Sequence, residues 1–179
     1  MKPLALGLCL MILMHGARGQ EAPGPSPQPG PEIRKLAYYL GTWKGEGEAK
    51  GGPFGPAGKL SSTTTCEWFA GGFQLVCRGE ENGPTGKRTF LNIRGYDGKT
   101  KSYAEYGISS LGDSEYTTGG TIEDGRKTFI VDIDAGGKPG QVRYTERQVS
   151  PTLFTYRAEV SVDGGPWTEI AEGKVAKVE

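Results

Sequence analysis

Hydrophobic and polar positions alternate along most of the chain, in short runs separated by glycine-rich turn signals. In the run Leu153–Val162, Phe154, Tyr156, Ala158 and Val160 share one face, and mainly polar residues lie between them. This period of two is typical of a half-buried strand. Segments such as ENGPTG, YDGKT and DGGP separate the runs. The pattern predicts ten strands, at residues 42–50, 58–69, 73–80, 87–96, 101–108, 114–123, 127–132, 141–149, 153–162 and 167–178.

A short helix is predicted before the first strand. The segment EIRKLAYYL places Ile33, Leu36, Ala37 and Leu40 at helical spacing after Pro31. The strands that follow are too close in sequence for parallel crossovers, so we expect an antiparallel meander. Ten twisted strands with one apolar face bury that face best by closing into a barrel, which also removes the sheet edges. The predicted fold is therefore all-β, with a short N-terminal helix.

The segment TCEWFAGGFQLVCR, residues 65–78, predicts a hairpin with a two-residue turn at Gly71 and Gly72. This turn places Cys66 opposite Cys77, in a hydrogen-bonded pair with Cα atoms about 5.5 Å apart, which is within reach of a disulfide. The same register gathers an apolar set on one face, namely Cys66, Trp68, Ala70, Phe73, Leu75 and Cys77. A slip by one residue would destroy that sorting.

The first residues have the pattern of a secretory signal peptide. Lys2 is followed by the apolar run LALGLCLMILM and by Ala17-Arg18-Gly19, a small-x-small cleavage pattern. The run is shorter than the about 20 apolar residues that a membrane helix needs. The next segment, QEAPGPSPQPGP, has the alternating prolines of an extended spacer. We expect a signal peptide at 1–19, a proline-rich linker at 20–31, one domain at 32–179, and a secreted or periplasmic protein.

Cysteine and histidine usage limits the chemistry. With Cys9 in the signal segment, two cysteines enter an oxidising compartment, which favours a structural disulfide between Cys66 and Cys77 over a redox pair or a metal site. The only histidine is His15, also in the signal segment. A catalytic triad cannot be built without histidine, and the carboxylates form no motif that names a reaction. We expect no enzyme, no catalytic residues and no metal site.

The charge balance gives no reason to expect nucleic acid or an anionic membrane as a partner. The chain has 21 basic and 21 acidic residues. Loss of Lys2 and Arg18 with the signal peptide would leave a small negative net charge, of about two units, whereas nucleic-acid-binding domains are strongly basic.

The segment LGTWKGEGEAK, residues 40–50, resembles the G-x-W start of the calycin barrels, which include lipocalins, fatty-acid-binding proteins and nitrobindins. Its LGTW-x-GEG form is most similar to nitrobindin and to a bacterial secreted family catalogued as domain of unknown function 1579. The resemblance continues through TTTCEWFAGGFQLV, GYDGKTKSYA and VRYTER, and it covers about residues 36–179. Trp43 shares a face with Gly41, Gly45 and Gly47, so its ring can plug one barrel end where the glycines let the strand curl.

The resemblance implies carriage of a small apolar ligand, because a ten-stranded barrel is wide enough to keep part of its interior open. For Trp43, a core role is favoured over ligand contact. For the other candidates, core packing and cavity lining stay open, since pockets and cores use the same residue types. The candidate ligand-binding residues are Trp43, Trp68, Phe73, Leu75, Tyr144, Glu146, Phe154 and Tyr156.

Glu146 is the most distinctive of these candidates. It shares a strand face with Tyr144, and a buried carboxylate would need a partner such as Arg143, Arg94 or a tyrosine hydroxyl. The poor alternation of this strand favours an exposed Glu146 instead. Glu105 is a second, weaker candidate.

Nitrobindin-like barrels bind haem through a histidine in the late strands, and EIAEGKVAKV has none. The sequence therefore excludes histidine-ligated haem after the signal segment, leaves tyrosine ligation as a remote alternative, and predicts no cofactor. Two functions follow as hypotheses. One is a barrel that binds a small apolar ligand. The other is a packed barrel that acts as an interaction module at the cell surface, which a filled interior and an apolar outer patch would favour.

Overall fold

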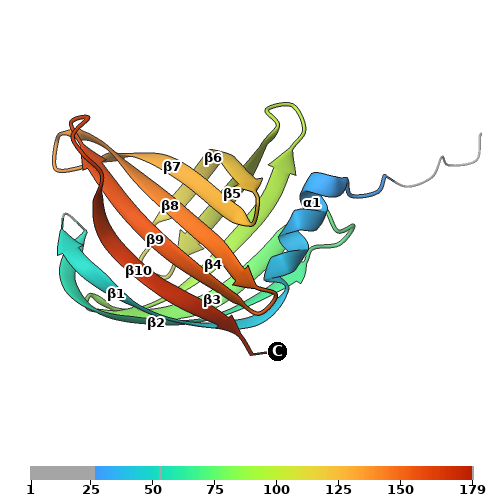
Figure 1. Cartoon of the computed structure of the whole chain (residues 1–179), viewed down its shortest axis with the longest axis horizontal. Helices are drawn as coiled ribbons and strands as arrows, with labels where there is room; N and C mark the ends of the chain where they lie inside the picture. Colours follow the sequence, from blue (N-terminus) through green and yellow to red (C-terminus); the bar gives the residue numbers. More distant parts are fainter. Residues whose placement is uncertain (1–26, 53, 179) are drawn as a thin grey trace, which may run out of the picture.

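The computed structural model describes residues 27–52 and 54–178, and in this part of the chain one short helix precedes ten strands (Figure 1). The predicted signal peptide and most of the predicted linker lie outside the described residues. The helix α1, Pro31–Lys35, continues directly into the 3-10 helix η1, Leu36–Tyr39. The strands are β1 (Gly41–Gly52), β2 (Gly55–Trp68), β3 (Leu75–Gly83), β4 (Gly86–Asp97), β5 (Ser102–Ser109), β6 (Ser114–Glu123), β7 (Arg126–Asp134), β8 (Pro139–Ser150), β9 (Leu153–Val162) and β10 (Thr168–Lys177).

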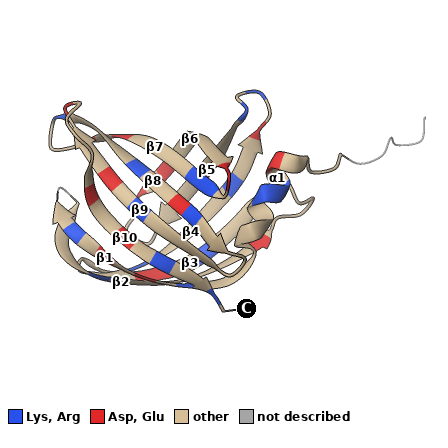
Figure 2. Cartoon of the chain, in the orientation of Figure 1, with Lys and Arg blue, Asp and Glu red and all other residues tan. Residues whose placement is uncertain are grey.

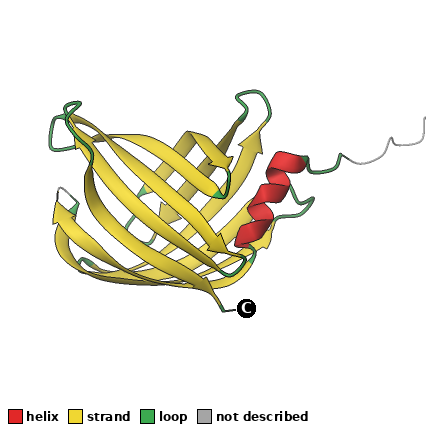
Figure 3. Ribbon diagram, viewed as in Figure 1, coloured by secondary structure: helices red, strands yellow, loops and turns green. Residues whose placement is uncertain are grey.

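The strands form a closed antiparallel barrel in which each strand pairs with its sequence neighbours (Figure 3). Closure comes from β1 and β10, whose register runs from Trp43 opposite Lys177 to Ala49 opposite Ala171. The all-β fold, the ten strands and the helix before them are confirmed. Because the first strand pairs with the last, each of the ten described strands has a paired neighbour on both sides, as expected for a closed meander.

The alternating pattern places apolar side chains inside the barrel. Phe154 and Tyr156 of β9 point inward, whereas the Arg157 side chain between them and Ala158 is 55% exposed and its Nε lies 3.0 Å from Glu169 Oε2. Glycines make room for the large inward rings. A Cβ on Gly47 would lie 2.3 Å from Tyr156 Oη, and one on Gly173 would lie 2.6 Å from the same ring. These two glycines are therefore needed wherever Tyr156 keeps its present position.

The helical segment plugs one end of the barrel (Figure 1). Leu36 and Tyr39 of η1 are almost fully buried, in a cluster with Leu75 and Phe129 from the strands. Trp43 follows directly in β1, is also buried, and donates its indole N–H to the Tyr39 carbonyl at 2.9 Å. The plug thus joins the start of the first strand to the interior, and the Trp43 ring lies at this end of the barrel.

The hairpin of β2 and β3 has the predicted register, with Cys66 opposite Cys77 and a disulfide between them. The turn differs from the prediction. Strand pairing stops before the turn, and Phe69 N–H donates to the Gln74 carbonyl at 2.8 Å, so four residues form the loop. This changes which pairs are hydrogen-bonded, because bonded and non-bonded pairs alternate along an antiparallel ladder. The cysteines form a non-hydrogen-bonded pair with Cα atoms 4.1 Å apart, so the expected bonded pair was wrong.

Strands β6 and β7 pair over only three residues, from Thr121 opposite Thr128 to Glu123 opposite Arg126. Beyond that point, residues 114–117 and 120 of β6 pair with β5 across a register shift at 118–119, and residues 129–134 of β7 pair with β8, but β6 and β7 do not pair with each other. We call this opening the β6–β7 seam. It widens from the plugged end toward the opposite end. Phe129 packs over Gly120 at its narrow end, where a Cβ would lie 2.3 Å from the Phe129 ring.

Charged residues of both signs are interspersed along the strands (Figure 2). No helix within residues 27–52 and 54–178 is long and apolar enough to cross a membrane.

Candidate ligand cavity

The barrel encloses a cavity of about 370 Å³. Tyr39, Trp43 and Phe154 line it at the plugged end. At the other end, the lining comes from residues close to the β3–β4 and β5–β6 turns, including Arg88 and Glu115. The volume lies within the range of roughly 300–1,000 Å³ that is typical of small-molecule sites. The interior is therefore not filled by its own side chains.

Five of the eight predicted ligand-binding residues line this cavity: Trp43, Tyr144, Glu146, Phe154 and Tyr156. The other three lie toward the plugged end. Leu75 is fully buried in the cluster around Leu36 and Tyr39, Trp68 packs against that cluster, and Phe73 is part of the β2–β3 loop. Their distance from the cavity follows from the position of the helix, which covers the hairpin end of the barrel.

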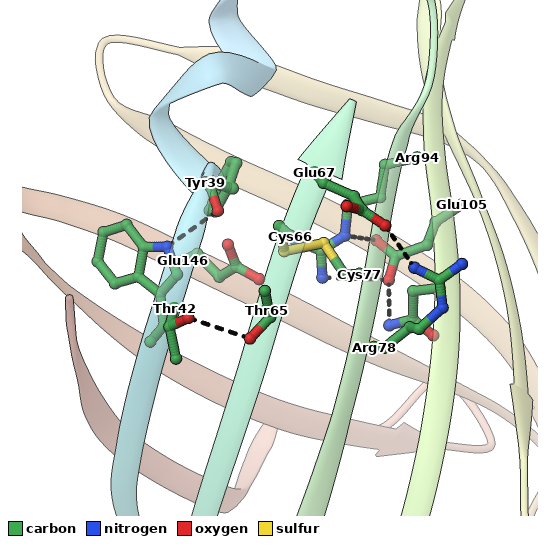
Figure 4. Close-up of a disulfide and its surroundings, with 12 residues drawn as sticks. Tyr39, Thr42, Thr65, Cys66, Glu67, Cys77, Arg78, Arg94, Glu105 and Glu146 are labelled. Atoms are coloured by element: carbon green, nitrogen blue, oxygen red, sulfur yellow. Dashed lines mark hydrogen bonds and ion pairs between the residues drawn. A yellow bond between two sulfur atoms is a disulfide. The ribbon is translucent and has the colours of Figure 1, made fainter. Parts of the chain in front are cut away.

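The rings of Tyr39 and Trp43 form the floor of the cavity at its plugged end. Four charged side chains lie in the barrel interior next to this floor, and we call them the ion network: Arg94, Glu105, Lys127 and Glu146. Figure 4 shows all of them except Lys127. Arg94 Nε lies 3.0 Å from Glu105 Oε2, and Lys127 Nζ lies 2.7 Å from Glu146 Oε1. Lys127 Nζ also lies 3.8 Å from Glu105 Oε2, which links the two pairs. Asn92 Nδ2 donates to Glu105 Oε1 at 2.9 Å. The two cations and two carboxylates neutralise each other.

The exposed position favoured for Glu146 is wrong. Its side chain is only 17% exposed, because the register of β7 and β8 sets it opposite Lys127 on the inward face. Lys127 is the close partner. Arg143 points outward, where it binds Glu159 at 2.8 Å and covers the Trp167 ring at 4.4 Å from its centroid.

Electrostatics keeps Glu146 ionised at neutral pH. Burial alone would raise the pKa of the Glu146 carboxyl, but the positive charges of Lys127 and Arg94 outweigh it and hold this pKa below its ordinary 4.5. Burial, together with the nearby Glu146 charge, raises the pKa of the Tyr39 hydroxyl far above its usual range. Lys127 Nζ and Arg94 Cζ lie 5.2 Å and 5.4 Å from the Tyr39 ring centroid, so the ring also faces both cations.

Sequence reasoning did not single out Lys127. The signal was present, because Lys127 is in phase with Phe129 and Val131 on the inward face of the same strand. A lysine in the apolar phase of a strand indicates a buried cation that needs a carboxylate partner. Within the described residues, Glu146 Oε2 is buried without a hydrogen-bond partner, and so is Arg94 Nε, despite its short ion-pair contact.

The rim of the cavity away from the helix is acidic. At this rim the Arg88 guanidinium is paired with a carboxylate, since Arg88 Nε lies 3.2 Å from Glu81 Oε1. Glu115 accepts a hydrogen bond from Thr117 Oγ1 at 2.7 Å, and Asp113 accepts one from Ser109 Oγ. Tyr144 lines the cavity and is 47% exposed as a residue, which fits an opening to solvent.

A closed ten-stranded meander with a helical plug and an internal cavity defines a calycin-like barrel protein. More closely, the chain belongs to the family described as "Protein of unknown function (DUF1579)", which matches residues 28–177.

Solved structures of other proteins share the fold, and two of them are similar to this chain as follows. Rv2717c from M. tuberculosis is 12% identical, with a TM-score of 0.58, over 85% of this chain and 100% of its own. The S-type phycobiliprotein lyase CPES from Guillardia theta is 11% identical, with a TM-score of 0.51, over 82% of this chain and 92% of its own. No curated protein matches the chain.

Proposed function

We propose that this barrel is a non-enzymatic binding protein that holds a small apolar ligand in its cavity. The observation that carries the proposal is the cavity of about 370 Å³, whose wall includes the aromatic rings of Trp43, Tyr144, Phe154 and Tyr156. Such a wall contributes apolar contact area to a ligand. The plug at one end and the rim at the other define the direction in which a ligand would lie.

The fold alone does not separate a carrier from an enzyme, since one fold neighbour is named as a lyase. The lining favours the carrier. The only histidine of the chain is His15, and Cys66, which lines the cavity, is held in the disulfide. Glu105 and Glu146 of the ion network are engaged by cations, so neither of these interior carboxylates is free to act as a nucleophile or general base.

Displacement of the uncharged dye N-phenyl-1-naphthylamine tests the proposal, together with native mass spectrometry of protein purified from its own host. The Ser62→Phe variant adds a ring to the cavity wall and should abolish dye binding. Thr63→Phe places the same ring outside the cavity, on the next residue of β2, and should bind the dye like the wild type. If the wild type neither retains a ligand from the host nor binds any apolar probe, the proposal is wrong.

We further propose that the protein works in an oxidising compartment, secreted or periplasmic. The disulfide between Cys66 and Cys77 and the signal-like pattern of residues 1–19 support this location. Fractionation of the native host, with thiol counting on the unreduced protein, tests it. A protein retained in the cytoplasm with two free thiols would contradict it.

An interaction module is the second candidate, because an apolar stripe crosses the outer wall. Ile93, Tyr106 and Tyr116 are lateral partners on β4, β5 and β6, and their side chains are 37%, 42% and 68% exposed. Aromatic side chains at such density often mark contact surfaces. In-host cross-linking of the wild type and of Tyr116→Lys tests it. A cross-linked partner lost only in the variant supports this role, and identical cross-linking in both proteins contradicts it.

A further inference from the structure

Each positive charge inside the cavity is already matched by a carboxylate. Lys127 binds Glu146 and Arg94 binds Glu105 in the ion network, and Arg88 binds Glu81 at the rim. Arg157 also borders the cavity, but its guanidinium binds Glu169, with Nε 3.0 Å from Oε2, so it contributes no free charge. A carboxylate ligand that entered would therefore have to leave its charge unpaired or displace an existing partner, and both are costly in a low-dielectric interior.

The rim carries negative charge without a matching cation. Asp113 and Glu115 line the cavity, and no Lys or Arg nitrogen among the described residues lies within 4.0 Å of either carboxylate. Their hydrogen bonds come from the hydroxyls of Ser109 and Thr117, which leave the charge in place. The field at the rim therefore attracts cations and repels anions.

The aromatic wall between the floor and the rim suits an unbranched or flat apolar group. Phe90 and Tyr156 line this length of the cavity. An occupant with one charged end gains most when its apolar part contacts these rings and its charged end stays at the solvated rim, because burial of an unpaired charge costs far more than exposure of it.

Building on the proposed carrier function, we propose that the ligand is a cationic amphiphile, an apolar group that ends in an amine. Its ammonium lies at the rim beside Asp113 and Glu115, and its apolar part extends toward the Trp43 and Tyr39 floor. The site then selects against fatty-acid anions of the same length. This preference is opposite to that of a barrel whose interior offers a free arginine or lysine.

Competition by decylamine, decanol and decanoate against N-phenyl-1-naphthylamine at pH 7 measures the head-group preference at constant chain length, below micelle-forming concentrations. We expect decylamine to displace the dye at an at least about tenfold lower concentration than decanoate, with decanol between them. The preference should shrink as salt is added, because the rim charges are screened.

The double variant Asp113→Asn/Glu115→Gln should lose most of the amine preference while decanol binds as before. Glu46→Gln/Glu123→Gln removes the same charge from exposed positions outside the cavity lining and should keep the preference. Decanoate competing as well as decylamine overturns this inference and leaves the carrier intact, as does an unchanged preference in the rim variant. Failure of the dye and of all three compounds to bind overturns the carrier itself.

Discussion

The ion network shows which of two opposing effects decides the state of a buried charge. Removing Lys127 and Glu146 from water costs several kcal/mol per ion, and mutual attraction offsets this only when the geometry is good. The contact of 2.7 Å between Lys127 Nζ and Glu146 Oε1 meets that condition, and Glu105 provides a second carboxylate at 3.8 Å. The pair therefore adds little net stability, and its main effect is to fix how the side chains of the barrel interior are arranged.

Removing one partner should be much worse than removing both. We expect Lys127→Met to lower the free energy of unfolding by about 3–5 kcal/mol, because Glu146 is left buried and less well paired. The double variant Lys127→Met/Glu146→Leu should recover most of this loss. Urea denaturation measures both. A double variant as unstable as the single one would show that the pair is not coupled.

The pH dependence of stability follows from the lowered pKa of Glu146. The folded-state pKa lies below the ordinary 4.5, so the stabilisation is present above pH 4.5 and is lost as the pH falls through the folded value. In Lys127→Met, burial should instead raise this pKa, and acidification from pH 7 toward 5 should stabilise the variant relative to the wild type. Melting temperatures across this range test the sign. Parallel curves for both proteins would contradict it.

The disulfide should stabilise the fold without serving the site. Cys66 and Cys77 are 11 positions apart in the sequence, and a loop this short allows at most about 3 kcal/mol of stabilisation. We expect Cys66→Ala/Cys77→Ala to melt at a lower temperature with nearly unchanged dye affinity. Calorimetry and dye titration measure the two effects. Loss of binding at unchanged stability would indicate a functional role for the cysteines instead.

At the scale of the elements, the β6–β7 seam is the part of the barrel wall that lacks a continuous ladder. Residues 114–117 and 120 of β6 pair only with β5, and residues 118 and 119 pair with neither neighbour, so amides in this segment that point away from β5 have no strand partner. The seam is bridged at its narrow end by Phe129 over Gly120 and by the Lys127–Glu105 contact, which reaches from β7 to β5. Side chains, in place of backbone bonds, hold the wall together at that point.

Hydrogen exchange should reveal the seam directly. We expect the amides of residues 114–120 that face β7 to exchange much faster than their alternate neighbours and than the amides of β8 and β9, because they lack a strand acceptor. Residue-resolved NMR exchange measures this. Uniform protection along β6 would contradict an open seam. A Gly120→Ala variant should extend fast exchange to Thr121, since its Cβ displaces Phe129.

At the scale of the whole molecule, closure depends on the pairing of β1 with β10, which joins residues from opposite ends of the domain. Deletion from Trp167 onward should leave β1 and β9 as long unpaired edges, and the product should aggregate and lose its cooperative melting transition. Trp167→Ala is the control, because it removes the ring and keeps β10. A truncated protein that stays soluble and melts cooperatively would argue against this role of closure.

Much of this fold could be predicted because alternation reports directly on strand faces. The Cys66–Cys77 register came from sorting the hairpin side chains, and the disulfide distance is consistent with it. The loop between Phe69 and Gln74 was mispredicted, since a two-residue and a four-residue loop give the same facing pairs and differ only in hydrogen bonding.

Partners across strands were harder to predict than faces. The partner of Glu146 depends on the register between β7 and β8, which the turn after Asp134 sets, and that turn gives no register signal in the sequence. The cavity boundary was equally hidden. Trp68 and Leu75 have the same alternation as Trp43, but only the position of the helix decides which side of the plug each residue occupies.

The seam also bears on the shape of molecule that the cavity can accept. The floor of Tyr39 and Trp43 is rigid, because the helix packs behind it, the Trp43 indole is bonded to the Tyr39 carbonyl, and Lys127 of the ion network contacts the Tyr39 ring. The wall near the rim is compliant, since no ladder joins β6 to β7 there. A rigid floor limits the length of a bound ligand along the barrel axis. A deformable side wall accepts ligands of different width. Discrimination should therefore be sharp between homologues of different length and weak between slender and bulky molecules of equal length.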